Sequence, residues 1–153
     1  MATVWADSAA AGFLPLLPDG HVLPELDLER LEATVLDPSV HLLLAEEGGT
    51  LLGYAAFGSS RDDDAPEDVG EVRTFFVHPT AWRRGVGTRL MARALEELAG
   101  FGFRRATVWS FADNARANAF YESHDFARDG SERREDVWAG ILEVRYERSL
   151  RPG

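Results

Sequence analysis

The sequence predicts a single α/β domain whose central sheet contains strands of both directions. The chain has 153 residues and no repeat, low-complexity tract or linker that would divide it, so one domain is expected. Runs of β-branched and apolar residues, bounded by turn residues, predict strands over 40–45, 51–58 and 72–77. Apolar residues at helical spacing over 86–98 precede a further strand pattern over 106–111. Because a helix connects them, the strands on either side of it should run parallel.

The N-terminal part of the chain predicts helices and a hairpin. Helices are expected over 5–17, where Pro15 should kink the helix or end it early, and over 26–35. The strand over 40–45 is apolar apart from His41 and should be buried. His41 should face outward or form a hydrogen bond, because no histidine or acid stands near it at metal-ligand spacing.

The C-terminal part should complete the sheet. Asp113 or Asn114 should cap a helix that continues to about Ser123. Phe126 then opens a strand, and the pattern over 141–146 closes the domain with another. The predicted order is a helical start, three strands, a helix, a strand, a helix and two strands, which indicates a sheet of mixed direction and not a doubly wound one.

The composition excludes or disfavours several classes of function. The formal net charge is −10, whereas nucleic-acid-binding proteins normally present a basic field. The chain has no cysteine, which excludes disulfides, thiolate-bound zinc and a cysteine nucleophile. It has no apolar run of about 18 residues or more and no signal-like start, so a cytoplasmic protein without a membrane segment is expected. The acidity would suit a cationic substrate, or it serves solubility alone.

An acidic loop over 59–68 follows the predicted hairpin. It contains the run Asp62-Asp63-Asp64 but lacks the residue spacing of a calcium loop. Solvated surface is therefore expected there, and no metal site is predicted.

The segment from Gly70 to Leu98 has the pattern of an anion-binding site. A strand leads into a glycine-containing loop, and the loop leads into a helix. The first N–H groups of a helix have no acceptor within it, so they can bind an anion. Gly85 and Gly87 lack Cβ, which lets a phosphate approach the main chain, and Arg83 and Arg84 add positive charge there. The stretch therefore predicts a phosphate-binding cradle.

Two common nucleotide motifs do not fit this loop. A dinucleotide fingerprint that starts at Gly85 would need a glycine where Leu90 stands, and a Walker loop needs a Gly-Lys pair that is absent. The stretch instead resembles the acetyl-CoA motif of the GNAT superfamily, R/Q-x-x-G-x-G/A, which follows a strand ending in Val-His-Pro. Residues 82–87 match this motif, with Trp82 at the position that usually holds Arg or Gln.

A second motif supports the resemblance. In GNAT proteins an asparagine begins a helix and a tyrosine follows at a fixed spacing, which Asn114 and Tyr121 match. Phe126 matches the Gly-Phe that ends the motif, with Asp125 in place of the glycine. The resemblance covers roughly 40–148.

The resemblance implies both a fold and a cosubstrate. The fold is a mixed, mostly antiparallel sheet with a V-shaped split between the family's parallel fourth and fifth strands, flanked by helices. The cosubstrate is acetyl-CoA, whose pantetheine arm would pair with main-chain groups inside the split while its pyrophosphate lies on the cradle. The residues implied to bind it are Phe75, Phe76, Val77, Arg83, Arg84, Gly85, Val86, Gly87, Thr88 and Asn114.

The start of the domain departs from the family pattern. Many members open with a strand before the first helix, whereas the domain over 1–153 starts essentially at the helix. An unpaired sheet edge invites self-association. A homodimer that covers this edge is therefore expected.

The resemblance also implies a reaction, acetylation of a primary amine. Such an amine is only about one part in a thousand neutral at pH 7, so a general base, direct or through water, is useful. Glu71 lies where some members carry a catalytic glutamate, and Tyr121 could protonate the leaving thiolate. Glu71 could equally be a solvated strand-end carboxylate, and Tyr121 a phenol that only packs on its helix. Trp109 stands where members that acetylate peptide N-termini carry a glutamate, which argues against that subgroup.

Two rival functions stay open at this point. A non-catalytic acyl-CoA-binding sensor or scaffold would keep the cradle and transfer nothing. A protein that binds another nucleotide is the second rival. The acceptor amine is not identified by the sequence, since antibiotics, polyamines, amino acids and protein lysines all remain candidates.

Overall fold

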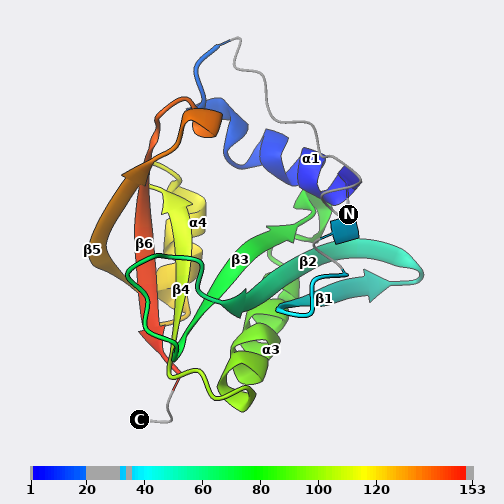
Figure 1. Cartoon of the computed structure of the whole chain (residues 1–153). Coiled ribbons are helices and arrows are strands. Elements are labelled where there is room, and N and C mark those ends of the chain that lie inside the picture. The colour runs from blue at the N-terminus through cyan, green and yellow to red at the C-terminus, as the bar shows by residue number, and fades with distance from the viewer. Residues whose placement is uncertain (1, 20–31, 34–35, 151–153) are drawn as a thin grey trace.

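The computed structural model describes residues 2–19, 32–33 and 36–150 (Figure 1). Six strands form one sheet in the order β1-β2-β3-β4-β6-β5. Only β3 and β4 run parallel, and every other neighbouring pair is antiparallel, as the mixed-sheet prediction requires. The strands are β1 (Val40–Glu47), β2 (Thr50–Ser59), β3 (Val69–Val77), β4 (Arg105–Phe111), β5 (Ala127–Arg134) and β6 (Leu142–Ser149).

The parallel pair is short, and this shapes the whole sheet. Its register joins Val69 to Arg105, Gly70 to Ala106 and Glu71 to Thr107, and no pairing continues beyond Glu71. The two strands then diverge toward their C-terminal ends, so that they form a V (Figure 1). The V-shaped split expected between the parallel strands is confirmed.

The described helices are α1 (Ala2–Ala11), α3 (Val86–Gly100) and α4 (Ala115–Ser123), with 3-10 turns at η1 (Leu14–Leu16), η2 (Pro79–Ala81) and η3 (Asp136–Trp138). The predicted helix over 5–17 is present but shorter: the α-helix stops at Ala11, ahead of Pro15, which was expected to kink it or end it early. Pro15, which has no N–H to donate to a helical hydrogen bond, lies in the short 3-10 turn that follows. The predicted helix over 26–35 lies almost entirely outside the described residues. No described helix is long and apolar enough to cross a membrane.

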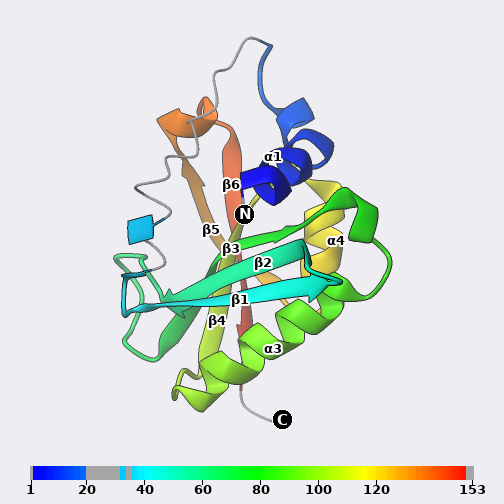
Figure 2. The same cartoon turned by 90° about the vertical axis from the view of Figure 1, so that its right-hand side faces the viewer.

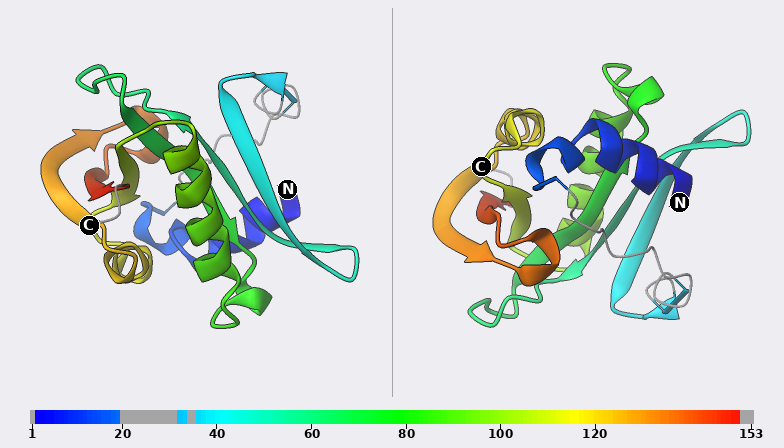
Figure 3. Two further views of the ribbon diagram at one scale, coloured as in Figure 1. Left: turned by 90° about the horizontal axis from the view of Figure 1, so that it is seen from below. Right: turned by 90° about the horizontal axis from the view of Figure 1, so that it is seen from above.

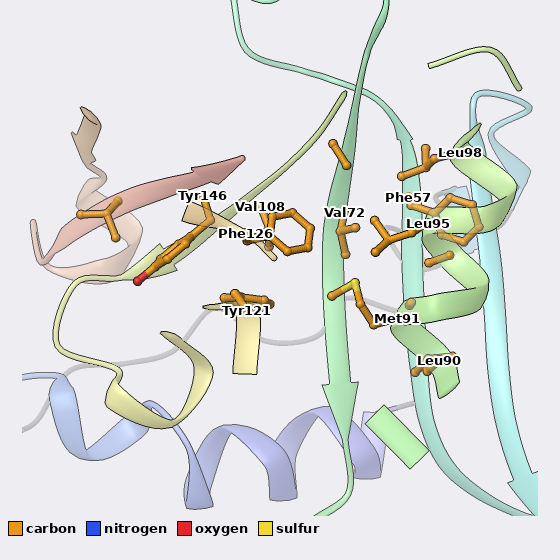
Figure 4. Packing of buried hydrophobic residues seen from close by; sticks show 14 residues of the cluster. Phe57, Val72, Leu90, Met91, Leu95, Leu98, Val108, Tyr121, Phe126 and Tyr146 are labelled. Atoms are coloured by element: carbon orange, nitrogen blue, oxygen red, sulfur yellow. The ribbon is translucent and has the colours of Figure 1, made fainter. Parts of the chain in front are cut away.

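One hydrophobic core joins both arms of the V. Helix α3 packs beneath β1 and β2 (Figure 2) and buries one apolar face. Figure 4 shows Met91 and Leu95 of α3 on one side of Val72, and Tyr121 and Tyr146 on the other. The buried residues of α3 are Val86, Leu90, Met91, Ala94, Leu95 and Leu98.

Helix α1 lies across the open end of the V (Figure 3). Ser8 Oγ donates a hydrogen bond of 2.9 Å to the main-chain oxygen of Val77 at the end of β3. Phe13, just after the helix, packs against Phe111 at the end of β4, with ring centroids 5.5 Å apart. The N-terminal segment therefore joins the tips of the two diverging strands.

Strand β1 differs from the prediction of a buried strand. It pairs with β2 alone among the described residues, so it is an edge strand, and the Leu44 side chain is 49% exposed. His41 does not simply face outward, because its ring stacks on Phe57 and on Phe101, with centroids 5.7 and 4.2 Å away. These contacts join residues far apart in the chain, which strand periodicity does not reveal.

Candidate active site

The loop before α3 leaves its main-chain donors free, as the cradle requires. Gly85 is the N-cap of the helix, at φ 79°, and no side chain caps it. The helical ladder begins with the N–H of Arg89, which donates to the oxygen of Gly85. The N–H groups of Val86, Gly87 and Thr88 therefore have no acceptor within the helix and can bind an anion.

Gly85 and Gly87 have different surroundings. A Cβ at Gly85 would meet nothing within 4 Å, so a ligand can reach the main chain there. A Cβ at Gly87 would lie 3.3 Å from the ring of Phe120, so the space at this residue is filled by a side chain of α4. Open approach is thus available at Gly85, and tight helix packing explains Gly87.

The arginines of the loop are also unequal. Arg83 lines the cavity described below and adopts a positive φ of 63°. Arg84 does not line that cavity; its guanidinium binds the Glu47 carboxylate at 2.8 and 3.0 Å. The side chain of Val86 is buried in the core, so only its main chain faces the loop. Arg83 is therefore the predicted arginine that is free to face a phosphate.

The ladder between β2 and β3 determines which main-chain groups face the V. The N–H of His78 donates to the oxygen of Leu52 at 2.7 Å. Since bonding residues alternate along an antiparallel ladder, the main-chain groups of Phe76 face β2, whereas those of Phe75 and Val77 face the open side. The carbonyl of Val77 accepts from Ser8 Oγ and from Trp82 Nε1. Both main-chain groups of Phe75 and the N–H of Val77 remain for a ligand strand.

A cavity of about 1480 Å³ connects this region to the opposite side of the sheet. It holds both predicted catalytic residues together with the cradle. On the cradle side it is lined by Arg83, Gly85, Gly87, Thr88, Asn114 and Tyr121. On the other side it is lined by Glu71, Trp109, Glu143, Phe13, Phe111 and Trp138.

Helix α4 presents Asn114 and Tyr121 to the cavity. Asn114 is the N-cap, as predicted, and its Oδ1 accepts from the N–H of Ala117 at 3.3 Å. The helix is fastened to β4 by buried Asn118, whose Oδ1 accepts from Ser110 Oγ at 2.7 Å and whose Nδ2 donates to Ala112 O at 3.0 Å. Asn118 was not predicted to have this role, because its partners on and after β4 are identified only by the fold.

Tyr121 is held in a form that can donate a proton. Its ring packs among Phe120, Phe126 and Tyr146, at centroid distances of 5.8, 6.1 and 5.9 Å. Burial, with a smaller contribution from Tyr146, raises the pKa of the Tyr121 hydroxyl to about 12. Among the described residues no group hydrogen-bonds this hydroxyl, so its proton is available to a ligand in the cavity.

Glu71 is not a solvated carboxylate. Its side chain is 2% exposed, and Arg61 binds it with three donors: the main-chain N–H, Nε and Nη2, at 3.0, 3.2 and 2.9 Å. Burial raises the pKa of Glu71, but the hydrogen bonds and charge of Arg61 outweigh it and hold the pKa below 4.5. Glu71 is therefore ionised at neutral pH, and Arg61 moderates its basicity.

A second buried carboxylate lies on the same side of the cavity. Glu143 is 5% exposed and accepts from Arg133 Nε and Nη2, both at 3.2 Å. Arg133 also pairs with Glu135 and lies over the ring of Trp109, 4.2 Å from its centroid. Burial raises the pKa of Glu143, against the charge of Arg133. This cluster comes from β4, β5 and β6, and no sequence motif indicated it.

The acidic loop after β2 is only partly solvated surface, so that expectation is wrong at Asp62. Its carboxylate accepts from Trp109 Nε1 at 2.9 Å and from Arg145 Nη1 at 3.1 Å. Asp64 also binds Arg145, at 3.0 Å. Over the described ranges, no three histidine or acidic side chains lie close enough together to hold a metal ion.

Comparison with known proteins identifies the family. The model of the Acetyltransferase (GNAT) family matches residues 8–126. The chain is 31% identical over 93 residues to mycothiol acetyltransferase of Stackebrandtia nassauensis, with 61% of this chain and 28% of that protein covered. It is 41% identical over 97 residues to the N-alpha-acetyltransferase RimI of Mycobacterium tuberculosis, with 63% of this chain and 58% of that protein covered.

The fold agrees with solved structures. The PaiA N-acetyltransferase of Thermoplasma acidophilum, solved in complex with coenzyme A, superposes with a TM-score of 0.69 at 12% identity, over 97% of this chain and 89% of that one. The chain spans less than two thirds of the length of both sequence relatives. The chain belongs to the GNAT family of acetyltransferases.

Proposed function

We propose that this protein transfers an acetyl group from acetyl-CoA to a primary amine. The observation that carries the proposal is the divergence of β3 and β4 beside an uncapped helix N-terminus, with both facing one cavity. An extended pantetheine arm can add to the free edge of β3 while a pyrophosphate accepts from the helix. The names of the two sequence relatives, and the coenzyme A bound to the structural relative, support this use of the site.

The predicted cofactor-binding residues divide into three groups under this proposal. The main chain from Gly85 to Thr88, with Arg83, takes the pyrophosphate. Phe75 and Val77 offer main-chain groups to the amides of the pantetheine arm, and Phe76 supports them from the β2 side. Asn114 reaches the cofactor from the start of α4.

Three proton transfers accompany the reaction. In bound acetyl-CoA the amine attacks the thioester carbonyl, so that the acetyl group passes to nitrogen and the thiolate leaves. Glu71 accepts the proton that the ammonium loses, through a water molecule, because Arg61 already occupies its carboxylate. Tyr121, whose hydroxyl is protonated at neutral pH, donates its proton to the leaving sulfur. The nitrogen loses its second proton as the amide forms, and this proton restores the Tyr121 hydroxyl.

The acceptor should enter from the side of the cavity that holds Glu71 and Glu143. The aromatic rings of Phe13, Phe111 and Trp138 form one wall there, with Phe111 and Trp138 centroids 5.7 Å apart. The carboxylates on this side favour a cationic amine. The names of the relatives point to a small-molecule amine and to a protein α-amine, and the acceptor screen must include both.

An acetyl-CoA consumption screen tests the proposal. The purified chain is incubated with acetyl-CoA and, separately, a polyamine, an aminoglycoside, an amino acid, a peptide with a free N-terminus and a lysine peptide. Free thiol and the mass of the acetylated product are both measured. The proposal expects at least one amine to gain an acetyl group. Tight binding of acetyl-CoA with no product from any amine would instead support the non-catalytic acyl-CoA-binding module.

A further inference from the structure

Trp82 is fixed at the edge of the cradle by its own indole. Its Nε1 donates to the main-chain oxygen of Val77 at 2.8 Å, so the ring is held at the end of β3. Arg116, in the first turn of α4, lies over this ring with its guanidinium carbon 3.8 Å from the centroid. Both side chains line the cavity that contains the cradle. Trp82, at the β3 side of the V, therefore stacks against the guanidinium of Arg116, which comes from α4 on the other side.

The charge of Arg116 is not committed to a carboxylate. Within the described part of the chain it forms no ion pair, whereas Arg84 binds Glu47 and Arg93 binds Glu97. Arg83, which lines the same cavity, likewise has no ion pair in the described structure, so both arginines beside the cradle are free of carboxylates. A guanidinium that stacks on an aromatic face keeps its in-plane N–H donors free, and these match two phosphate oxygens.

The geometry points to a role that the sequence could not assign. We infer that Arg116 binds the diphosphate of the acyl-CoA and that Trp82 positions it. The acetyl-CoA motif usually has Arg or Gln at the position of Trp82. In this protein the side-chain donor is instead Arg116 of α4, and the residue at the motif position, Trp82, provides the ring on which Arg116 stacks. This inference rests on the proposed acyl-CoA binding.

Calorimetry with matched arginine variants tests the assignment. Arg116→Ala should weaken CoA binding about tenfold, the usual effect of one lost charge-assisted hydrogen-bonding group at an accessible site. The loss should be equal with dephospho-CoA, which lacks the 3′-phosphate but keeps the diphosphate. Arg104→Ala is the control, because Arg104 is exposed, has no ion pair in the described structure and does not line the cavity. It should bind CoA like the wild type.

A double variant that moves the arginine from position 116 to position 82 distinguishes phosphate binding by Arg116 from a merely structural role. Trp82→Arg in the Arg116→Ala background restores a donor at the motif position and should recover most of the lost affinity. Equal CoA affinity of Arg116→Ala and the wild type would overturn the inference and leave the proposed function intact. A loss seen with CoA but not with dephospho-CoA would assign Arg116 to the 3′-phosphate and overturn the diphosphate assignment. A wild type that does not bind CoA would overturn the proposed function itself.

Discussion

At the scale of single residues, the neighbours of a side chain decide whether it can move a proton. Tyr121 is recognisable in the sequence by its position in the second motif, and Glu71 by its position in the strand where some members of the family carry a catalytic glutamate. Their surroundings are not recognisable there. The rings around Tyr121 come from α4, from β6 and from Phe126 just before β5, and the partner of Glu71 lies in the loop after β2. The structure buries the Tyr121 hydroxyl, which raises its pKa, and pairs Glu71 with Arg61, which lowers the pKa of the carboxyl so that it is ionised at neutral pH.

Tyr121→Phe tests the proton donor. We expect turnover to fall by about a hundred- to ten-thousand-fold, the usual contribution of a general acid, with little change in the KM for acetyl-CoA. The free energy of unfolding should change by less than about 0.5 kcal/mol, since no described group hydrogen-bonds the lost hydroxyl. Steady-state kinetics and urea unfolding measure the two effects.

Tyr146→Phe is the matched control for that variant. Its hydroxyl accepts from Arg128 and donates to Glu122, two exposed residues, and Tyr146 does not line the cavity. It should lose about 0.5–1.5 kcal/mol of stability and keep its turnover. If Tyr121→Phe acetylates the amine as fast as the wild type does, Tyr121 is not the acid.

The pair of Glu71 and Arg61 predicts a pH-dependent stability. The pKa of Glu71 lies below 4.5 in the folded state, so the pair stabilises the protein fully above that pH and progressively less as the pH falls through the folded-state pKa. Glu71→Gln should lower the free energy of unfolding by about 1–3 kcal/mol at pH 7, a range kept modest because Arg61 is 57% exposed. Urea unfolding from pH 7 to pH 3 should show this difference shrink.

Glu67→Gln provides the control for charge alone, because Glu67 is exposed and unpaired in the described part of the chain. It should alter stability by less than about 0.5 kcal/mol at every pH. In the enzyme assay, Glu71→Gln should slow acetyl transfer most near neutral pH and less at high pH, where more amine is already neutral. A difference from wild type that stays constant from pH 7 to pH 3 would contradict the ionic role.

At the scale of elements, local pattern predicted most of the fold. The strand, loop and helix from β3 to α3 follow from periodicity and glycine placement, and so does the parallel direction of β4. The exposed edge of β1 and the pairing of Asp62 with Arg145 were mispredicted, because both depend on contacts between distant segments. The Glu143 cluster was missed for the same reason, since three strands contribute to it.

The start of α3 is the element that the cradle depends on, and a pair of glycine variants tests it. Gly85→Ala and Gly48→Ala both place a Cβ at positive φ, 79° and 57°, where nothing lies within 4 Å. Each should lose about 1–2 kcal/mol of stability by urea unfolding, the cost of a left-handed alanine. Only Gly85→Ala should weaken CoA binding in calorimetry, because its Cβ stands where the phosphate would approach. Equal CoA affinity in the two variants would show that no phosphate of CoA approaches the main chain at Gly85.

At the scale of the whole molecule, β1 forms one edge of the sheet. We propose that a second copy of the protein covers this edge. Strand β1 has no outer partner among the described residues, and Leu44 is 49% exposed on it. Sedimentation equilibrium should give twice the chain mass of 16.9 kDa at high concentration. Leu44→Lys should shift the mass toward one chain, since charge on an edge strand opposes pairing. A single-chain mass at every concentration would rule out the dimer.

The central claim also concerns the whole molecule: acyl-CoA binds in the V between β3 and β4. Amide hydrogen exchange followed by NMR, with and without CoA, tests it residue by residue. The N–H groups of Phe75, Val77 and the cradle from Gly85 to Thr88 should exchange more slowly when CoA binds. The N–H of Phe76, already bonded to β2, should change little. Protection confined to other parts of the chain, with Phe75 and the cradle unaffected, would contradict the account.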